Sequence, residues 1–228
     1  MSVKAHLSQR HHLVFEIIIL LLIISFSFLT IFAKQYSYFS FDLTVTQFIQ
    51  QLTDPNFLRV MQFITDLGYP FLAIPSVVIV VIFLWWKLNP LAALAVVISS
   101  AGGHLITTFI KSLVDRPRPD QSLINQLDLL INSSSFPSGH VMYFISFYGL
   151  LCYLAWVGIA KPNLRIAICI SLAILIGLIS ISRIYLGAHW FSDVMGSYLL
   201  GLVWLYGVIR IYRLFLTKKL LTNIKISK

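Results

Sequence analysis

Three short stretches of this sequence place ionisable side chains between long apolar runs. The first, KSLVDRPRP, begins at Lys111; the second, SSSFPSGH, ends at His140; the third, SRIYLGAHWFSD, runs from Ser182 to Asp193. Ionisable side chains at membrane depth are costly and usually have a function. These stretches are therefore the candidates for a site that does chemistry.

The residue types in the three stretches suit phosphoryl transfer. Arginine guanidinium groups match the oxygens of a phosphate, and a lysine adds a further positive charge. A glycine lets the backbone approach an anion closely, and the N-terminus of a helix directs N–H groups towards it. Spacing alone does not choose between Arg116 and Arg118. The candidate phosphate ligands are Lys111, one of Arg116 and Arg118, Ser138, Gly139 and Arg183.

Two histidines can divide the remaining work, one attacking phosphorus and the other protonating the leaving oxygen. His189 and Asp193 are four residues apart and share one face of a helix. The carboxylate can therefore orient one ring nitrogen and leave the other as the nucleophile. We predict His189 as nucleophile, Asp193 as its partner and His140 as general acid. No carboxylate cluster with metal-ligand spacing accompanies them, so no metal or other cofactor is predicted.

The elements that position these residues follow from composition. Of the 228 residues, 58% are hydrophobic and 11% are charged, whereas a soluble domain carries roughly 25% charged residues. A membrane-spanning helix needs about 20 mostly apolar residues, and six stretches qualify: 13–32, 67–86, 91–110, 141–160, 166–182 and 194–209. We predict an all-α, polytopic membrane protein, a single domain over residues 1–228 whose six transmembrane helices form one bundle.

The orientation of the bundle is predicted from lysine and arginine in the connecting segments. With a cytoplasmic N-terminus, eleven cations face inwards and six outwards, and four of those six belong to the motifs. Both termini are therefore predicted in the cytoplasm, and all three motifs at the outer face of the plasma membrane. The net charge of +9 is explained by this orientation and by anionic lipid, so no nucleic acid partner is predicted. Cys152 and Cys169 lie inside apolar runs and are interpreted as small buried side chains.

Two amphipathic segments lie between the first and second predicted spans. Asp54 and Pro55 are predicted to begin the second of them, as N-cap and first helical residue. Two short helices on the outer membrane surface and two helices packed on the bundle are both compatible with this pattern. The apolar residues that share a face are Val45, Phe48, Ile49 and Leu52 in one segment, and Phe57, Val60, Met61 and Ile64 in the other.

The motifs resemble those of the type 2 phosphatidic acid phosphatase superfamily of membrane lipid phosphatases. The pattern of that family is Lys-x6-Arg-Pro, then Pro-Ser-Gly-His, then Ser-Arg-x5-His-x3-Asp, and every position is matched in order between Lys111 and Asp193. The resemblance implies hydrolysis without a metal, through a phosphohistidine on His189. It also assigns Arg118, and not Arg116, to the phosphate.

The predicted function is therefore hydrolysis of a lipid phosphate or diphosphate at the outer membrane face. The resemblance implies undecaprenyl diphosphate, phosphatidylglycerol phosphate or phosphatidic acid as substrate, with a weak preference for an isoprenoid diphosphate. A transporter and a non-catalytic protein that binds lipid phosphates are the alternatives. The first is disfavoured because paired broken helices and repeat symmetry are missing, and the second because the histidine pair is intact.

Overall fold

The computed structural model describes residues 3–127 and 133–226, with side chains from 13 to 218 within those ranges. The described residues form helices and connecting segments without any strand, so the all-α prediction is confirmed. Six helices are long: α1 (Val3–Gln35), α4 (Pro70–Lys87), α5 (Pro90–Val114), α6 (Gly139–Gly158), α7 (Pro162–Tyr185) and α8 (Phe191–Ile226). Two are short: α2 (Ser40–Ile49) and α3 (Pro55–Asp66).

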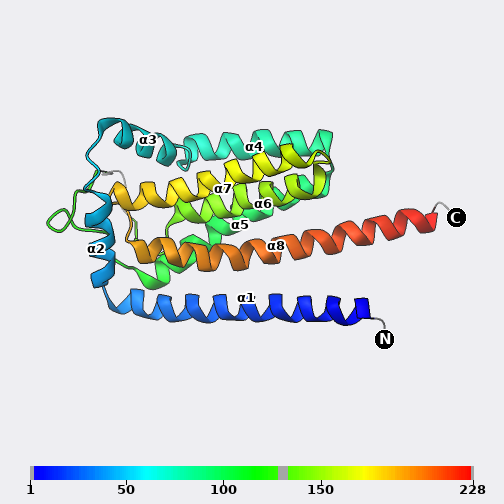
Figure 1. Cartoon of the computed structure of the whole chain (residues 1–228), viewed down its shortest axis with the longest axis horizontal. Helices are drawn as coiled ribbons and strands as arrows, with labels where there is room; N and C mark the ends of the chain where they lie inside the picture. The colour runs from blue at the N-terminus through cyan, green and yellow to red at the C-terminus, as the bar shows by residue number, and fades with distance from the viewer. Residues whose placement is uncertain (1–2, 128–132, 227–228) are drawn as a thin grey trace.

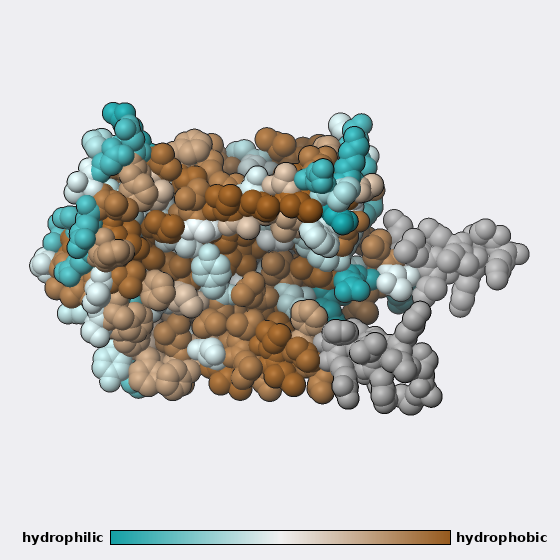
Figure 2. Space-filling view, in the orientation of Figure 1, coloured by the Kyte–Doolittle hydropathy of each residue, from teal (hydrophilic) through white to brown (hydrophobic). Residues whose placement is uncertain are grey.

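Each of the six long helices contains an apolar stretch long enough to cross a membrane. The helices run side by side, and α1 begins and α8 ends at the same end of the bundle (Figure 1). Figure 2 shows apolar side chains along the middle of the bundle and polar ones gathered at its two ends. The predicted bundle of six transmembrane helices is confirmed.

Prolines mark where several spans begin. Pro70, Pro90 and Pro162 are the first residues of α4, α5 and α7, where the missing N–H of proline removes no helical hydrogen bond. The end of α5 was predicted near Lys111, which is one turn too early. The helix continues to Val114 and stops at Asp115, whose φ of 49° is left-handed. Lys111 therefore belongs to the last turn of α5.

The helix α6 lies at the centre of the bundle, packed against α5, α7 and α8. Its buried side chains, among them Val141, Phe144 and Leu150, join the two largest core clusters. On the neighbouring α5, a Cβ at Gly102 would overlap the indole of Trp204 on α8, so this glycine permits close helix packing. The first span, α1, packs mainly against α8 and exposes most of its side chains.

The short helices α2 and α3 lie at the opposite end of the bundle from the termini (Figure 1). Asp54 is the N-cap of α3 and accepts a hydrogen bond from the backbone N–H of Asn56, as predicted. The predicted apolar faces are divided between two environments. Val45, Ile49, Phe57, Met61 and Ile64 pack on the bundle, whereas Phe48, Leu52 and Val60 are exposed.

Candidate active site

The ends of four spans bring the three sequence motifs to one end of the bundle. Lys111 lies in the last turn of α5 and His140 in the first turn of α6. Arg183 lies in the last turn of α7 and Asp193 in the first turn of α8. Because consecutive spans run in opposite directions, these four turns share one face. The fold therefore brings the three motifs together at one face, as predicted.

His189 lies in the connection between α7 and α8 and is almost completely buried. Nη1 of Arg118 lies 3.3 Å from its Nε2. Its other nitrogen, Nδ1, lies 3.6 Å from Oδ2 of Asp193, which is an ion-pair distance and not a hydrogen bond. The Oγ of Ser135 lies 3.5 Å from the same Nδ1. The two ring nitrogens thus face different surroundings, cationic at Nε2 and anionic at Nδ1.

The charge of the His189 imidazole is controlled by its surroundings. Burial is the largest influence, and with the positive charge of Arg118 it holds the pKa of His189 well below its usual value. Lys111 and Arg183 act in the same direction, and a hydrogen bond to the Ser135 backbone opposes them. The ring is therefore neutral over a wider range of pH, which a nucleophile requires.

The carboxylate of Asp193 is fully buried and is held on both oxygens. Its Oδ1 accepts from Nη1 of Arg116 at 2.6 Å. Its Oδ2 accepts from the backbone N–H of Trp190 at 2.9 Å and from the Ser135 hydroxyl. Since three groups donate to this carboxylate, its orientation relative to His189 is fixed.

The cations on the other side of His189 are held by two segments: the backbone before the Pro-Ser-Gly-His motif and the helix α3. Lys111 donates to the carbonyl of Ser134. Arg118 donates through Nε to the Ser133 carbonyl at 2.7 Å. Arg183 donates through Nη1 to the Thr65 hydroxyl at 3.2 Å. Each cation is thereby oriented by a segment outside its own motif.

At the start of α6, Ser138 is the N-cap residue, but its hydroxyl does not cap the helix. That hydroxyl and Nε2 of His140 are buried and have no hydrogen-bond partner within the described ranges. The His140 ring packs edge-on against Tyr69, with ring centroids 4.8 Å apart. A Cβ at Gly68 would overlap Cδ2 of the ring, so Gly68 and Tyr69 fix its position.

Several residues of the site were not predicted from the sequence. Asp42 on α2 and Thr65 on α3 lie far from the motifs in sequence, and nothing in their own spacing indicates a site. Ser135 lies close to a motif, but a serine in a serine-rich loop is a weak signal. Arg116 was considered for the phosphate and set aside. It lies behind Asp193 and contacts it at 2.6 Å.

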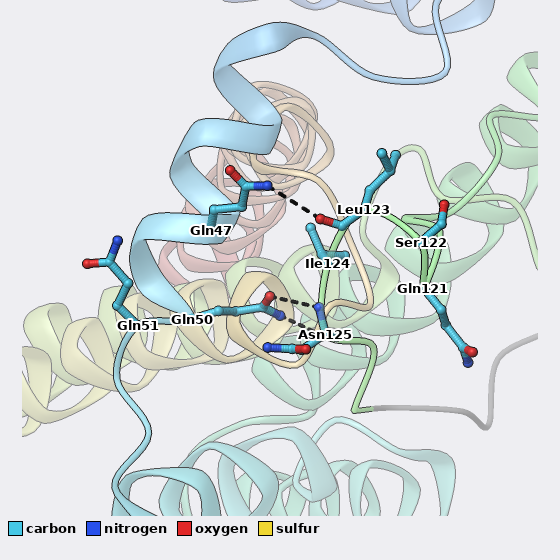
Figure 3. Close-up of a pocket in the computed structure, with 8 residues that line it drawn as sticks. All are labelled: Gln47, Gln50, Gln51, Gln121, Ser122, Leu123, Ile124 and Asn125. Carbon is cyan, nitrogen blue, oxygen red and sulfur yellow. Dashed lines mark hydrogen bonds between the residues drawn. The ribbon is translucent and has the colours of Figure 1, made fainter.

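A separate, shallow pocket opens between α2 and the loop that follows α5, and Figure 3 shows the eight residues that line it. The Gln50 amide accepts from the Asn125 N–H at 3.0 Å and donates to the Asn125 carbonyl at 2.6 Å. Gln47 donates to the Leu123 carbonyl at 3.4 Å. These glutamines therefore tie the loop to α2.

Among the described residues, no group of three or more histidine, cysteine or acidic side chains is placed to hold a metal ion.

Comparison with known proteins adds independent information. The sequence profile of the PAP2 superfamily matches residues 91–216. Phosphatidylglycerophosphatase B of Bacillus subtilis (strain 168) is 30% identical over 170 residues, which are 72% of this chain and 79% of the relative. The crystal structure of a transmembrane PAP2 type phosphatidylglycerolphosphate phosphatase from Bacillus subtilis superposes with a TM-score of 0.74 at 25% identity, over 85% of this chain and 94% of that one. Aquifex aeolicus LpxE shares the fold, with a TM-score of 0.61 at 21% identity over 75% of this chain and 96% of that one.

Proposed function

Because this chain belongs to the PAP2 superfamily and is a lipid phosphatase, we propose that it hydrolyses its substrate through a phosphohistidine on His189, without a metal ion. The observation that carries the proposal is the asymmetric surroundings of His189. Its Nε2 faces the Arg118 guanidinium, and its Nδ1 lies beside the Asp193 carboxylate. This arrangement suits attack by Nε2 on a phosphorus atom whose oxygens are held by cations.

In the first half of the reaction, Nε2 of His189 forms a bond to phosphorus, and the bond from phosphorus to the lipid oxygen breaks. His140 gives its proton to that oxygen, so the lipid leaves as an alcohol, or as a lipid monophosphate when the substrate is a diphosphate. The groups that hold the phosphoryl oxygens are Lys111, Arg118, Arg183, the Ser138 hydroxyl and the backbone at Gly139.

In the second half of the reaction, water replaces the lipid on the far side of the phosphorus atom. His140, now neutral, takes a proton from this water as its oxygen bonds to phosphorus and the bond to Nε2 breaks. Inorganic phosphate leaves, and His189 returns to its neutral form. The Asp193 carboxylate stabilises the positive charge that the His189 ring carries while it is phosphorylated.

The first substrate that we propose is phosphatidylglycerol phosphate. The support for it is the curated relative, a phosphatidylglycerophosphatase, which matches over most of both chains. Undecaprenyl diphosphate and phosphatidic acid are the other substrates to compare. We propose that the site faces the extracytoplasmic side of the plasma membrane and that both termini are cytoplasmic, as the distribution of lysine and arginine predicts.

The proposal is tested with the purified protein in detergent micelles that contain a chelator. We expect the wild type to release inorganic phosphate from at least one of the three lipids, and His189→Ala to release none. A radiolabelled phosphoryl group trapped by rapid quenching should be labile in acid and stable in base, as phosphohistidine is. Full activity of His189→Ala would remove His189 as nucleophile, and strict dependence on added magnesium would contradict the metal-free mechanism.

A further inference from the structure

The guanidinium of Arg116 is 1% exposed and bridges two buried carboxylates from different parts of the chain. Nη1 lies 2.6 Å from Oδ1 of Asp193, and Nη2 lies 3.0 Å from Oδ2 of Asp42. The side chains of both carboxylates are completely buried. A planar guanidinium can serve two carboxylates at once because its N–H groups form a rigid fork.

Asp42 belongs to α2, more than a hundred residues before the third motif, and it also contacts the start of α8 directly. Its Oδ1 accepts from the backbone N–H of Ser192 at 2.7 Å, and its Oδ2 accepts from the Ser192 hydroxyl at 2.7 Å. The same hydroxyl accepts from Nη1 of Arg116 at 2.7 Å. Asp42 therefore fixes both Arg116 and the first turn of α8, which carries Asp193.

From these contacts we propose that Asp42 and Arg116 are positioning residues for the phosphatase reaction, acting on the nucleophile His189 through the carboxylate of Asp193. The inference rests on the proposed function, because it assumes that His189 is the nucleophile. It extends that function to α2, a helix that carries none of the three motifs. Asp42 and the Arg116 guanidinium bond to Asp193 and Ser192, behind the nucleophile, so we expect both to act on turnover and not on substrate binding.

The three buried charges also set the electric field at His189. Asp42, Arg116 and Asp193 together carry a net charge of −1, which opposes the cations around the nucleophile. Those cations come from every neighbouring element: Lys111 from α5, Arg118 from the loop after it and Arg183 from α7. The other titratable neighbour is His140 on α6. Removing one negative charge from this group of three residues should therefore make His189 harder to protonate.

The test measures kcat, KM and the acid limb of kcat/KM in detergent with one lipid substrate, so that the titration of the substrate is common to all variants. Asp42→Asn should lower kcat by about 10- to 100-fold, with KM little changed. It should also move the acid limb to lower pH by about one pH unit. The double variant Asp42→Asn with Arg116→Met restores the net charge of −1, so its acid limb should return towards that of the wild type.

Two further variants separate positioning from loss of structure. Arg116→Lys keeps all three charges but replaces the fork by a single ammonium group, so kcat should fall while KM and the acid limb stay. This variant supplies the test even if Asp42→Asn does not fold. The matched control is Asp54→Asn, which removes an exposed carboxylate at the same end of the bundle and should leave turnover and pH profile unchanged.

The inference is overturned if Asp42→Asn, folded as judged by thermal unfolding, keeps the kcat and acid limb of the wild type. It is also overturned if Arg116→Lys raises KM and leaves kcat unchanged, or if the double variant does not recover the acid limb. The proposed function fails by different results: no phosphate release by the wild type, or full activity of His189→Ala.

Discussion

At the residue scale, the two ring nitrogens of His189, the proposed nucleophile, have different surroundings. Nδ1 of His189 faces a carboxylate that accepts from Arg116 and from the Ser135 hydroxyl, whereas Nε2 faces Arg118. A histidine enclosed in this way remains neutral unless the solution is acidic, because protonation would place a charge in a buried site and beside several cations. The reactive nitrogen thus keeps its lone pair.

The first prediction concerns the protonation of His189. Its pKa is held well below its usual value, which is about 6.5. The ring should therefore stay neutral as the pH falls through 6.5 and gain its proton only at more acidic pH. NMR of enzyme labelled with 13C at the histidine rings measures this directly, and His189→Ala identifies the resonance.

Removing a cation should move this titration in the opposite direction. In Arg118→Gln the positive charge nearest Nε2 is lost, so the ring should take up its proton at higher pH than in the wild type. A His189 resonance that titrates at or above 6.5 in the wild type, or does not move in Arg118→Gln, would contradict the account of the surrounding cations.

The second prediction separates the two histidines by their roles. His140→Asn should reduce hydrolysis of a lipid phosphate by about 10²- to 10⁴-fold, the usual contribution of a general acid. In single-turnover release of the leaving group, which precedes the water step that also uses His140, the loss should be much smaller for p-nitrophenyl phosphate, because nitrophenolate leaves without being protonated. His189→Ala should abolish both reactions. Equal single-turnover losses on both substrates in His140→Asn would remove the general-acid role.

Sequence patterns predicted which residues belong to the candidate site, but not most of the groups that these residues contact. His189 and Asp193 were paired from helical spacing, and they do lie together, but His189 precedes the first residue of α8, so a shared helical face is not what pairs them. The spacing could not reveal that the shorter bonds of Asp193 come from Arg116 and Ser135. Those partners are close in space but about sixty to eighty residues away in the chain. Asp42 was missed for the same reason, because its partners Arg116 and Ser192 lie 74 and 150 residues away in the chain.

At the element scale, the short helices α2 and α3 contact the ends of the spans and fix their positions. From α3, the carbonyl of Met61 and the hydroxyl of Thr65 each bond the Ser182 hydroxyl at 2.6 Å. The turn after α3 places Gly68 against His140.

The existence of all eight helices followed from apolar runs and proline positions. The extra turn of α5 did not, because a proline limits where a helix can end without fixing the last residue.

The third prediction tests the packing between the turn after α3 and the catalytic histidine of α6. In Gly68→Ala, the new methyl group would overlap Cδ2 of His140, so the ring has to move. We expect kcat to fall by about 10- to 100-fold, while the midpoint of thermal unfolding changes little. The matched control is Gly177→Ala on α7, where a Cβ meets nothing within 4 Å, and it should retain full activity. Normal turnover in Gly68→Ala would show that His140 tolerates displacement.

At the scale of the whole molecule, six spans separate two ends of different character. The catalytic motifs, α2 and α3 occupy one end, and the start of α1 and the end of α8 occupy the other (Figure 1). The positions of the six apolar stretches predicted this arrangement, because an even number of spans returns the chain to its starting side. Which end faces the cytoplasm rests on the distribution of lysine and arginine.

The fourth prediction tests that orientation with cysteine labelling in intact cells, in a chain whose two natural cysteines, Cys152 and Cys169, are replaced by alanine. Gln121 at the catalytic end and Lys161 at the other end are both exposed. A membrane-impermeant thiol reagent should label Gln121→Cys in intact cells and Lys161→Cys only after lysis. The reverse pattern would place the site on the cytoplasmic side.

The proposed reactive groups lie in the terminal turns of the spans or in the connections directly next to them, at one end of the apolar bundle. A lipid can therefore arrive by lateral diffusion, and encounter becomes a two-dimensional process. The rate should follow the mole fraction of substrate in the bilayer or micelle. Diluting the substrate with inert amphiphile at constant bulk concentration should then slow the enzyme, as if substrate had been removed.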